Sequence, residues 1–502
     1  MSSLTLQEHL RRMQEDTRLS TGIAGLDDIL HGGLAKGFLY LVEGSPGAGK
    51  TTLALQFLIE GAGHGETGLY ISLAESEAEL RHVAASHNFS LENIRICRIS
   101  PPELASGSGQ PYTVFQPAEV ELADVVETIL AMLRETNPKR VVIDSMSELR
   151  MLARDSLRYR RQVLALKQFF EGRDCTTLLL DERFREQSES QVQTIAHGVI
   201  SLEVLPREYG ITRRRLEVMK VRATGFREGY HDYVILKGGL SVFPRLVSGE
   251  YRSNGHPQED LSSGIQELDA LFYGGVQRGT ATLIAGPTGC GKSTLCSKWA
   301  YSAAQRGERA AIFTFDETRQ SFLDRSSGLG MELAPYIAEE MIHLDQLDPA
   351  ELSPGEFVER IRHGVETKEW RLVIIDSLNG LMNAMSEERA LIVQLHELLS
   401  YLNQVGVASF LVLAQYGLLG QGMTTPIDVS YLADNVLLLR YFEAQGEVRQ
   451  ALSVVKRRKG PHERSIREMQ IKEGKICIGD PLKNFTGVLT GTPEYIGGKE
   501  LL

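Results

Sequence analysis

The sequence predicts two α/β domains in tandem, each built on a mainly parallel central sheet. The chain has 502 residues, which is more than one ordinary hydrophobic core accommodates. The pattern G-x-x-x-x-G-K-[ST] occurs twice, as GSPGAGKTT and as GPTGCGKST. The runs VVID and VIID are apolar up to their last residue, as expected of strands that are buried on both faces of a parallel sheet.

The two halves of the chain are copies of one another. Lys50 and Lys292 lie 242 residues apart (292 − 50), and the same offset aligns STGIAGLDDILHGGLAKG with SSGIQELDALFYGGVQRG. We therefore expect a first domain at 1–247, a polar, turn-rich linker at 248–260, a second domain at 261–485 and a short tail at 486–502.

Each copy begins with an apolar strand that leads into a glycine-rich loop, and a helical stretch follows the loop. Glycines let the backbone approach phosphate groups, and the helix N-terminus adds favourable partial charge. The lysine of each motif would reach the β- and γ-phosphates of a nucleotide. The predicted nucleotide-binding residues are Gly44, Gly47, Gly49, Lys50, Thr51 and Thr52 in the first copy and Gly286, Gly289, Gly291, Lys292, Ser293 and Thr294 in the second.

A Mg²⁺ site is predicted beside each loop. The hydroxyls of Thr51 and Ser293 are placed to ligate the ion. Asp144 and Asp376 end the VVID and VIID strands, where a carboxylate can hold Mg²⁺ through water. The simpler interpretation is a turn aspartate at the end of a strand, but its repetition at matched positions favours the metal.

Acidic residues follow the second strand of each copy, upstream of these aspartates, and are candidates for a general base. The second copy reads FDET, with Asp316 and Glu317, whereas the first reads LAES, with Ala74 and Glu75. A carboxylate here could polarise an attacking water or hydroxyl. Because neighbouring strand residues face opposite ways, we favour Glu75 and Glu317, although solvated loop acids would give the same pattern.

Late in each domain a K-x-R pattern recurs, as Lys220 with Arg222 and as Lys456 with Arg458. These cations could neutralise nucleic-acid phosphates, form a solvated strand edge, or reach the γ-phosphate held by a neighbouring subunit. One pair for each nucleotide loop favours the third interpretation.

Composition limits the partners and the location. The net charge of −11 weighs against nucleic acid as the main partner, and no stretch approaches the ~20 apolar residues of a membrane span. The polar N-terminus lacks an apolar signal core, and the five cysteines have no metal spacing. We therefore expect a cytoplasmic protein with reduced thiols and no membrane partner.

Together with KRRKGPHERSIRE and NFTGVLTGTP near the end, these motifs resemble the KaiC family, a branch of the RecA-like P-loop ATPases. The resemblance covers nearly the whole chain. It implies two RecA-like domains and a homohexamer of stacked rings with ATP between subunits. It also implies ATP hydrolysis in the first domain, and serine autokinase and autophosphatase activity in the second. On this resemblance Lys220, Arg222, Lys456 and Arg458 contact the neighbour's nucleotide, and a KaiB-like or signalling protein is a possible partner.

The phosphoacceptor segment departs from the family pattern. In TTPIDVSYLAD the resemblance makes Ser430 the phosphoacceptor, but Tyr431 stands where the family has a threonine. An ordered two-site phosphorylation cycle therefore does not follow, and circadian timekeeping is not predicted. Ser430 could also be an ordinary interface serine. The competing functions are a RecA-like DNA-dependent ATPase and a signalling scaffold that ATP assembles without phosphotransfer.

Overall fold

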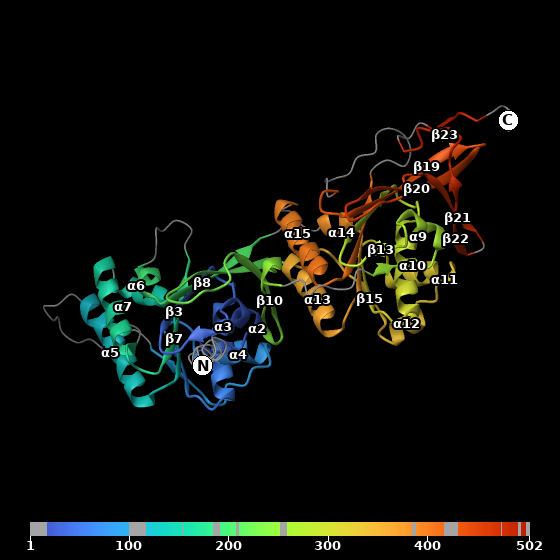
Figure 1. Ribbon diagram of the computed structural model, residues 1–502. Helices are drawn as coiled ribbons and strands as arrows, with labels where there is room; N and C mark the ends of the chain where they lie inside the picture. The colour runs from blue at the N-terminus through green and yellow to red at the C-terminus, as the bar shows by residue number, and fades with distance from the viewer. Residues whose placement is uncertain are drawn as a thin grey trace, which may run out of the picture. The chain divides into compact units, whose positions relative to one another are not determined.

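The computed structural model describes residues 18–99, 117–153, 155–183, 191–206, 210–251, 259–383, 388–415, 430–472, 474–489 and 493–497. The chain forms two compact units, Met1–Arg245 and Leu246–Leu502 (Figure 1).

The first unit contains a nine-stranded sheet in the order β11-β10-β9-β8-β3-β7-β6-β4-β5. Its parallel part consists of β3 (Leu39–Gly44), β4 (Gly68–Ser72), β5 (Ile94–Arg98), β6 (Arg140–Asp144), β7 (Thr176–Glu182) and β8 (Gly198–Leu205). An antiparallel extension follows through β9 (Arg213–Val221), β10 (Tyr230–Leu236) and β11 (Gly239–Phe243). Strand β3 lies near the middle of the sheet and ends at the first glycine-rich loop.

Helices cover both faces of this sheet (Figure 1). One apolar layer packs under α2 (Ala24–Ile29), α3 (Lys50–Gly63) and α4 (Glu77–Ser86). The other packs under α5 (Pro117–Thr136), α6 (Met146–Ala153), α7 (Ser156–Phe170) and α8 (Gln191–Ile195). The central strands are buried on both sides, which explains why VVID carries no polar residue before its final aspartate.

The second unit repeats this architecture. Its sheet has the order β16-β15-β17-β18-β14-β19-β20-β21-β22, which is the order of the first sheet read from its opposite edge, with each strand replaced by its counterpart. The parallel strands are β14 (Ala281–Gly286), β15 (Ala310–Thr314), β16 (Ile342–Gln346), β17 (Leu372–Asp376), β18 (Ala408–Ala414) and β19 (Asn435–Ala444). The antiparallel strands are β20 (Glu447–Arg457), β21 (Arg467–Lys472) and β22 (Lys475–Pro481).

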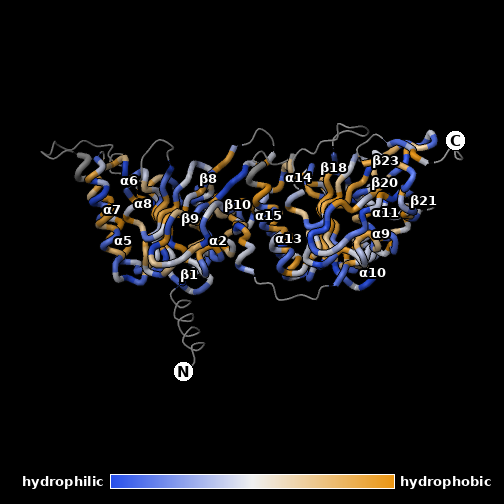
Figure 2. The backbone as a smooth tube through the Cα atoms, turned by 45° about the horizontal axis from the view of Figure 1, so that its top comes forward, coloured by the Kyte–Doolittle hydropathy of each residue, from blue (hydrophilic) through white to orange (hydrophobic). Residues whose placement is uncertain are grey.

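Two apolar layers again enclose the sheet, and Figure 2 shows hydrophobic residues concentrated along the central strands of both units. One layer contains residues of α9 (Gln266–Leu271), α10 (Lys292–Gln305) and α11 (Arg319–Ser327), with α12 (Ala334–Ala338) packed against it. The other contains residues of α13 (Pro354–Thr367), α14 (Leu378–Asn383) and α15 (Glu388–Gln404). The predicted fold, two tandem α/β domains with mainly parallel sheets, is confirmed.

Short elements complete each unit. Two-stranded ribbons form between β1 (Arg18–Leu19) and β2 (Leu34–Ala35), between β12 (Asp260–Leu261) and β13 (Val276–Gln277), and between β23 (Phe485–Thr486) and β24 (Glu494–Tyr495). The 3₁₀ helix η2 (Ser248–Glu250) opens the predicted linker. It is held to the second unit, because Glu397 accepts a hydrogen bond from the Ser248 amide at 2.9 Å and Tyr251 packs edge-on against Tyr401. Among the described residues, no helix is long and apolar enough to cross a membrane.

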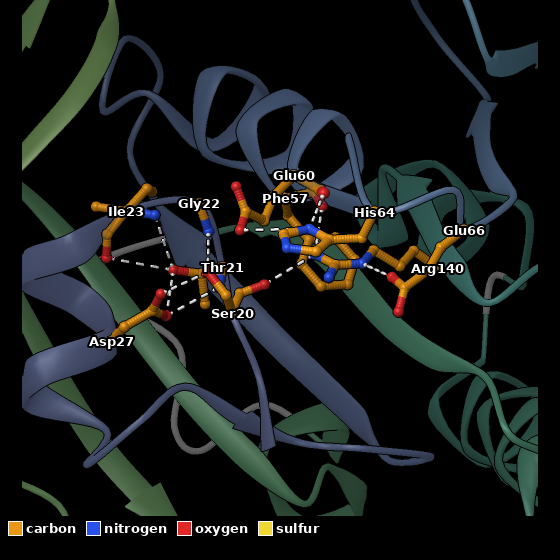
Figure 3. A network of polar contacts seen from close by, with 10 residues as sticks. All are labelled: Ser20, Thr21, Gly22, Ile23, Asp27, Phe57, Glu60, His64, Glu66 and Arg140. Carbon is orange, nitrogen blue, oxygen red and sulfur yellow. Dashed lines mark hydrogen bonds and ion pairs between the residues drawn. The ribbon is translucent and has the colours of Figure 1, made fainter. Parts of the chain in front are cut away.

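A buried arginine ties the segment around Ser20 to the middle of α3 and to Glu66 just beyond that helix (Figure 3). Arg140 donates to the carbonyl oxygens of Ser20 at 2.8 Å and Phe57 at 2.7 Å, and its Nε pairs with Glu66. Its guanidinium also lies over the Phe57 ring, 4.9 Å from the centroid. The side chain is 3% exposed, so its contacts must replace most of its hydration.

The second domain also pairs the equivalent glutamate with an arginine, but the arginine comes from a different position. Leu372 occupies the place of Arg140 on the equivalent strand, β17, and Glu308 occupies the place of Glu66. Here Arg278 supplies the missing cation, with 2.7 Å between its Nη2 and Glu308 Oε2. An ion pair to the equivalent glutamate is therefore present in both domains, but its cation lies on β6 in the first domain and directly after β13 in the second.

Candidate nucleotide site

A cavity of about 380 Å³ opens in the second unit at the carboxyl ends of β14, β15 and β17. This edge of a parallel sheet is where α/β proteins commonly bind ligands. The cavity includes most of the residues predicted for the second site. It is lined by Thr288, Gly289, Gly291, Lys292, Ser293, Thr294, Thr314, Asp316, Glu317, Arg325, Asp376, Ser377, Val412, Ala414 and Ile471.

The glycines of both loops adopt backbone conformations that other residues rarely accept. Gly47 and Gly49 have φ of 75° and 93°, and Gly289 and Gly291 have φ of 81° and 96°. Gly49 and Gly291 are the N-cap residues of α3 and α10, so each loop leads directly into a helix N-terminus. This arrangement presents backbone amides to an anion, which fits the phosphates of a nucleotide.

The lysine of each loop folds back over the loop itself. Lys50 Nζ donates to the carbonyl oxygens of Gly44 at 2.8 Å and Ser45 at 3.2 Å. Lys292 Nζ makes the matching contacts, with Gly286 at 2.9 Å and Pro287 at 2.6 Å. Burial lowers the pKa of Lys50, although the nearby carboxylates oppose this effect. Each ammonium is thus fixed inside the loop where phosphate would bind.

The hydroxyl and carboxylate predicted to hold Mg²⁺ come together in both domains. The Asp144 carboxylate accepts hydrogen bonds from the Thr51 hydroxyl and, at 2.5 Å, from Tyr70 Oη. The Asp376 carboxylate accepts one from the Ser293 hydroxyl. Burial raises the pKa of both aspartates, so a bound cation would favour their ionised forms. Oxygen ligands of this kind suit Mg²⁺, whose remaining ligands are usually phosphate and water.

Glu75 in the first domain lies close to the Asp144 carboxylate, and one of its own carboxylate oxygens is buried without a hydrogen bond. Its Oε2 atom is buried without a hydrogen-bond partner. Burial raises the pKa of Glu75, and the negative charge of Asp144 raises it further. Ala74 beside it is exposed and offers no second acid. A glutamate in this condition is suited to accept a proton from a reacting group.

The second domain places two acids in the cavity instead of one. Asp316 accepts a hydrogen bond from Ser377 Oγ at 2.5 Å. Glu317 forms a two-pronged ion pair with Arg325, with 3.2 Å between Arg325 Nε and Oε1 and 2.9 Å between Nη2 and Oε2. Two neighbouring strand residues should face opposite ways, but these two follow the end of β15 and both line the cavity.

Sequence reasoning did not find Arg325, Tyr70 or Ser377. Arg325 had a detectable signal, because the 242-residue offset aligns it with Val83 and so exposes a difference between the two copies. Tyr70 is one of several aromatic residues in buried strands, and nothing in its neighbourhood of the sequence indicates a contact with Asp144. Ser377 follows the predicted metal ligand directly, but its contact with Asp316 depends on the fold.

The basic pair of the second domain lies beside the predicted phosphoacceptor. Lys456 Nζ donates to the carbonyl oxygens of Ser430 at 2.9 Å and Ala433 at 2.8 Å. Arg458 donates to the carbonyl oxygen of Tyr431 at 3.3 Å and pairs with Asp434 at 3.4 Å. These residues are not among those that line the cavity described for the second unit.

In the first domain, Lys220 lies near the end of β9 and Arg222 just beyond it. Arg222 Nη2 donates to the carbonyl oxygen of Thr194 at 2.7 Å.

In the second domain, the predicted phosphoacceptor Ser430 is exposed, and Tyr431 beside it is 53% exposed. Residues 424–429 of the phosphoacceptor segment, including Thr425, lie outside the described residues.

Comparison with known proteins identifies a family for both halves of the chain. The family model described as "ATPase: KaiC" matches residues 19–247 and again 261–483. The chain is 27% identical to the circadian clock oscillator protein KaiC of Picosynechococcus sp., over 96% of this chain and 93% of that protein. It is 26% identical to the circadian clock protein KaiC3 of Synechocystis sp., with 96% of each chain covered. It is 28% identical to KaiC of Thermosynechococcus vestitus, over 97% of this chain and 93% of the relative.

Proposed function

Because the chain belongs to the KaiC family of ATPases, we propose that it is a homohexameric, Mg-ATP-dependent ATPase whose second domain is a serine autokinase and autophosphatase. The first domain binds ATP at Gly44–Thr52 and hydrolyses it slowly. The second binds ATP at Gly286–Thr294 and transfers its γ-phosphoryl group to Ser430. A KaiB-like or signalling protein is the proposed partner that would respond to the state of the ring.

In the first domain, Lys50 and the loop amides would hold the phosphates. Glu75 would take a proton from the attacking water, since it is the one acid at this position. Thr51 and Asp144, like Ser293 and Asp376 in the second domain, would hold Mg²⁺, which neutralises phosphate charge when bound. Ala74 stands where the second domain has Asp316, so the first domain lacks a second acid beside its glutamate. This absence supports assigning slow turnover to the first domain.

In the second domain, the Ser430 hydroxyl oxygen would form a bond to the γ-phosphorus as the bond between that phosphorus and the β–γ bridging oxygen breaks. ADP leaves, and the hydroxyl proton passes to a carboxylate of the Asp316 and Glu317 pair. Hydrolysis of the phosphoserine would use the same carboxylates to activate water.

The observation that carries the kinase proposal is the grouping of Ser430 with Lys456 and Arg458. None of these three residues lines the nucleotide cavity described for the second domain. An acceptor that does not line the cavity of its own domain would receive its phosphoryl group from the nucleotide of another copy of the chain. The two cations beside it would then meet that neighbour's phosphates. The net charge of −11 gives no comparable support to a DNA-dependent ATPase.

Intact mass tests the proposal directly. Purified protein incubated with Mg-ATP should gain one phosphate that maps to Ser430, and Lys292→Ala should abolish the gain. Lys298→Ala is the matched control, because Lys298 lies on the same helix but over the Tyr301 ring, 5.4 Å from its centroid. Steady ATP consumption with an unchanged mass would reject the kinase and leave a ring ATPase. Tight ATP binding with neither turnover nor phosphate would favour a scaffold.

Mixing two inactive variants tests transfer between subunits. Lys292→Ala retains the acceptor but loses its own donor site, whereas Ser430→Ala retains the donor site but loses the acceptor. Mixed rings should phosphorylate the Lys292→Ala chain alone, which mass spectrometry separates by its sequence. No phosphate in the mixture, with wild-type protein phosphorylated in parallel, would show that transfer occurs within one chain.

A further inference from the structure

Arg325 makes contacts that link the proposed base of the second domain to its nucleotide loop. It projects from α11, and its guanidinium forms the two-pronged pair with Glu317. A third contact, 3.4 Å from Arg325 Nη1 to Thr294 Oγ1, reaches the loop. The guanidinium lies over the ring of the buried Phe322, with 4.7 Å between Arg325 Cζ and the ring centroid.

The position of Arg325 in the cavity makes it accessible to an anion bound there. It lines the cavity together with Lys292 and Asp376, and its side chain is 26% exposed. A guanidinium has five N–H donors, and the contacts with Glu317 and Thr294 engage three of them. Arginine binds carboxylate and phosphate with the same two-pronged geometry, so the two anions can compete for it.

The first domain lacks this residue. The equivalent position on α4 is Val83, which packs against the core, and Glu75 has a buried oxygen without a partner where Glu317 has the arginine. The two domains therefore share the glutamate and the loop but differ in what holds the glutamate. This difference cannot be explained by a general structural need of the fold, because the first domain folds in the same way without it.

We propose that Arg325 senses the γ-phosphate in the second domain: it holds Glu317 in the ion pair when ATP is absent and turns to the γ-phosphate when ATP binds. The released Glu317 carboxylate then becomes available to the acceptor hydroxyl. ADP lacks the competing phosphate and leaves the ion pair in place. This proposal rests on the ATP-binding role proposed above for the second domain.

Nucleotide affinities of Arg325→Met test the proposal, measured by calorimetry in the full-length chain with Lys50→Ala to silence the first site. Methionine keeps an apolar stem over Phe322 and removes the charge. ATP affinity should fall about tenfold, the loss expected for one charged hydrogen bond, while ADP affinity changes less than about threefold. Ser430 phosphorylation should slow even at saturating ATP, and Arg325→Lys should restore part of the ATP preference.

Arg319→Met is the control, because Arg319 opens the same helix and donates to the Leu344 carbonyl oxygen at 2.5 Å. It should leave both affinities unchanged. Equal losses for ATP and ADP in Arg325→Met, or no loss for either, would overturn the proposal. So would a lowered melting temperature that Arg325→Lys does not rescue. If the Lys50→Ala parent itself binds no ATP, the proposed function fails instead, so the two failures are distinguishable.

Discussion

Lys456 Nζ donates a hydrogen bond to the carbonyl oxygen of Ser430 at 2.9 Å, and a second one to Ala433 at 2.8 Å. The proposed acceptor residue and a proposed phosphate-binding cation therefore belong to one local structure. The ammonium binds the backbone of the turn that carries Ser430 through these two carbonyl oxygens. Lys456 thus has a role within its own chain in addition to any contact with a neighbour.

Replacing Lys456 by Ala should slow Ser430 phosphorylation without weakening ATP binding by the same chain. We expect a rate loss of about tenfold or more, because a small displacement of an acceptor strongly reduces the rate of transfer. Phosphopeptide quantification over time gives the rate, and nucleotide binding is measured in parallel. Lys475→Ala, an exposed lysine at the start of β22, is the control. An unchanged phosphorylation rate would remove Lys456 from the proposed mechanism.

ATP hydrolysis by the first domain should depend on pH through Glu75. The raised pKa of this glutamate means that its ionised form is lost at a higher pH than for an ordinary glutamate. Activity should therefore rise with pH across that raised pKa and fall as the medium becomes acidic. The measurement is kcat/KM against pH in Lys292→Ala, in which the second site is silenced, since kcat/KM reports the free enzyme.

Glu75→Gln should lower that rate by about 10²- to 10⁴-fold, the usual contribution of a general base. Glu77→Gln is the control, because Glu77 is exposed and pairs with Arg81 at 2.7 Å. A Glu75→Gln enzyme that keeps the wild-type rate and pH profile would show that another group activates the water.

Acid should destabilise the first domain through His231. The Nδ1 atom of this buried histidine accepts a hydrogen bond from the Arg245 backbone amide at 2.8 Å. Its Nε2 atom lies 3.0 Å from the Arg227 carbonyl oxygen. The neutral ring satisfies both contacts, whereas protonation of Nδ1 would break the first. Burial lowers its pKa from 6.5 to about 4. The unfolded chain therefore binds more protons between these values, so stability falls as pH drops from 6.5 towards 4.

The full effect corresponds to about 3 kcal/mol of unfolding free energy, at 1.36 kcal/mol for each pKa unit. Hydrogen exchange of the Arg245 amide at pH 5 and pH 7.5 reports it locally, and His231→Gln should flatten the dependence. His64→Gln is the control because the His64 side chain is 67% exposed. Equal pH dependence in both variants would assign the acid sensitivity to other groups.

Two glycines with similar backbone conformations should respond differently to alanine. Gly49, in the first loop, has φ of 93°, and an added Cβ would lie 2.8 Å from Ile235 Cδ1. Gly65, after α3, has φ of 75° and open space around it.

Replacing either glycine by alanine should cost about 1 kcal/mol or more of stability, because alanine is strained at positive φ. Only Gly49→Ala should weaken nucleotide binding to the first domain, as measured by calorimetry in Lys292→Ala. Loss of binding in Gly65→Ala as well would indicate general destabilisation.

The fold was predictable because its signals repeat along the chain. The 242-residue offset, the glycine-rich loops and the apolar strands before Asp144 and Asp376 are local patterns with a direct physical cause. The loop residues and the carboxylates that meet them follow from the rule that parallel strands end at one edge of a sheet. This much of the site could be predicted from sequence.

The contacts that distinguish the two domains could not be predicted in the same way. The pair of Glu317 with Arg325 depends on how α11 turns against the strand before it, and the bond from Tyr70 to Asp144 depends on the pairing of β4 with β6. Such contacts join side chains whose orientations are set by packing, and many other residues of the same types make no comparable contact.

The pairs Arg140–Glu66 and Arg278–Glu308 mean that the two halves of this chain are no longer interchangeable parts. A chimera that carried β17 into the first domain would bring Leu372 to the place of Arg140. Glu66 would lose its partner, and the carbonyl oxygens of Ser20 and Phe57 would lose their donor. Each half has its own internal compensation, so matching segments are specific to their own domain even though the two sheets share one strand order.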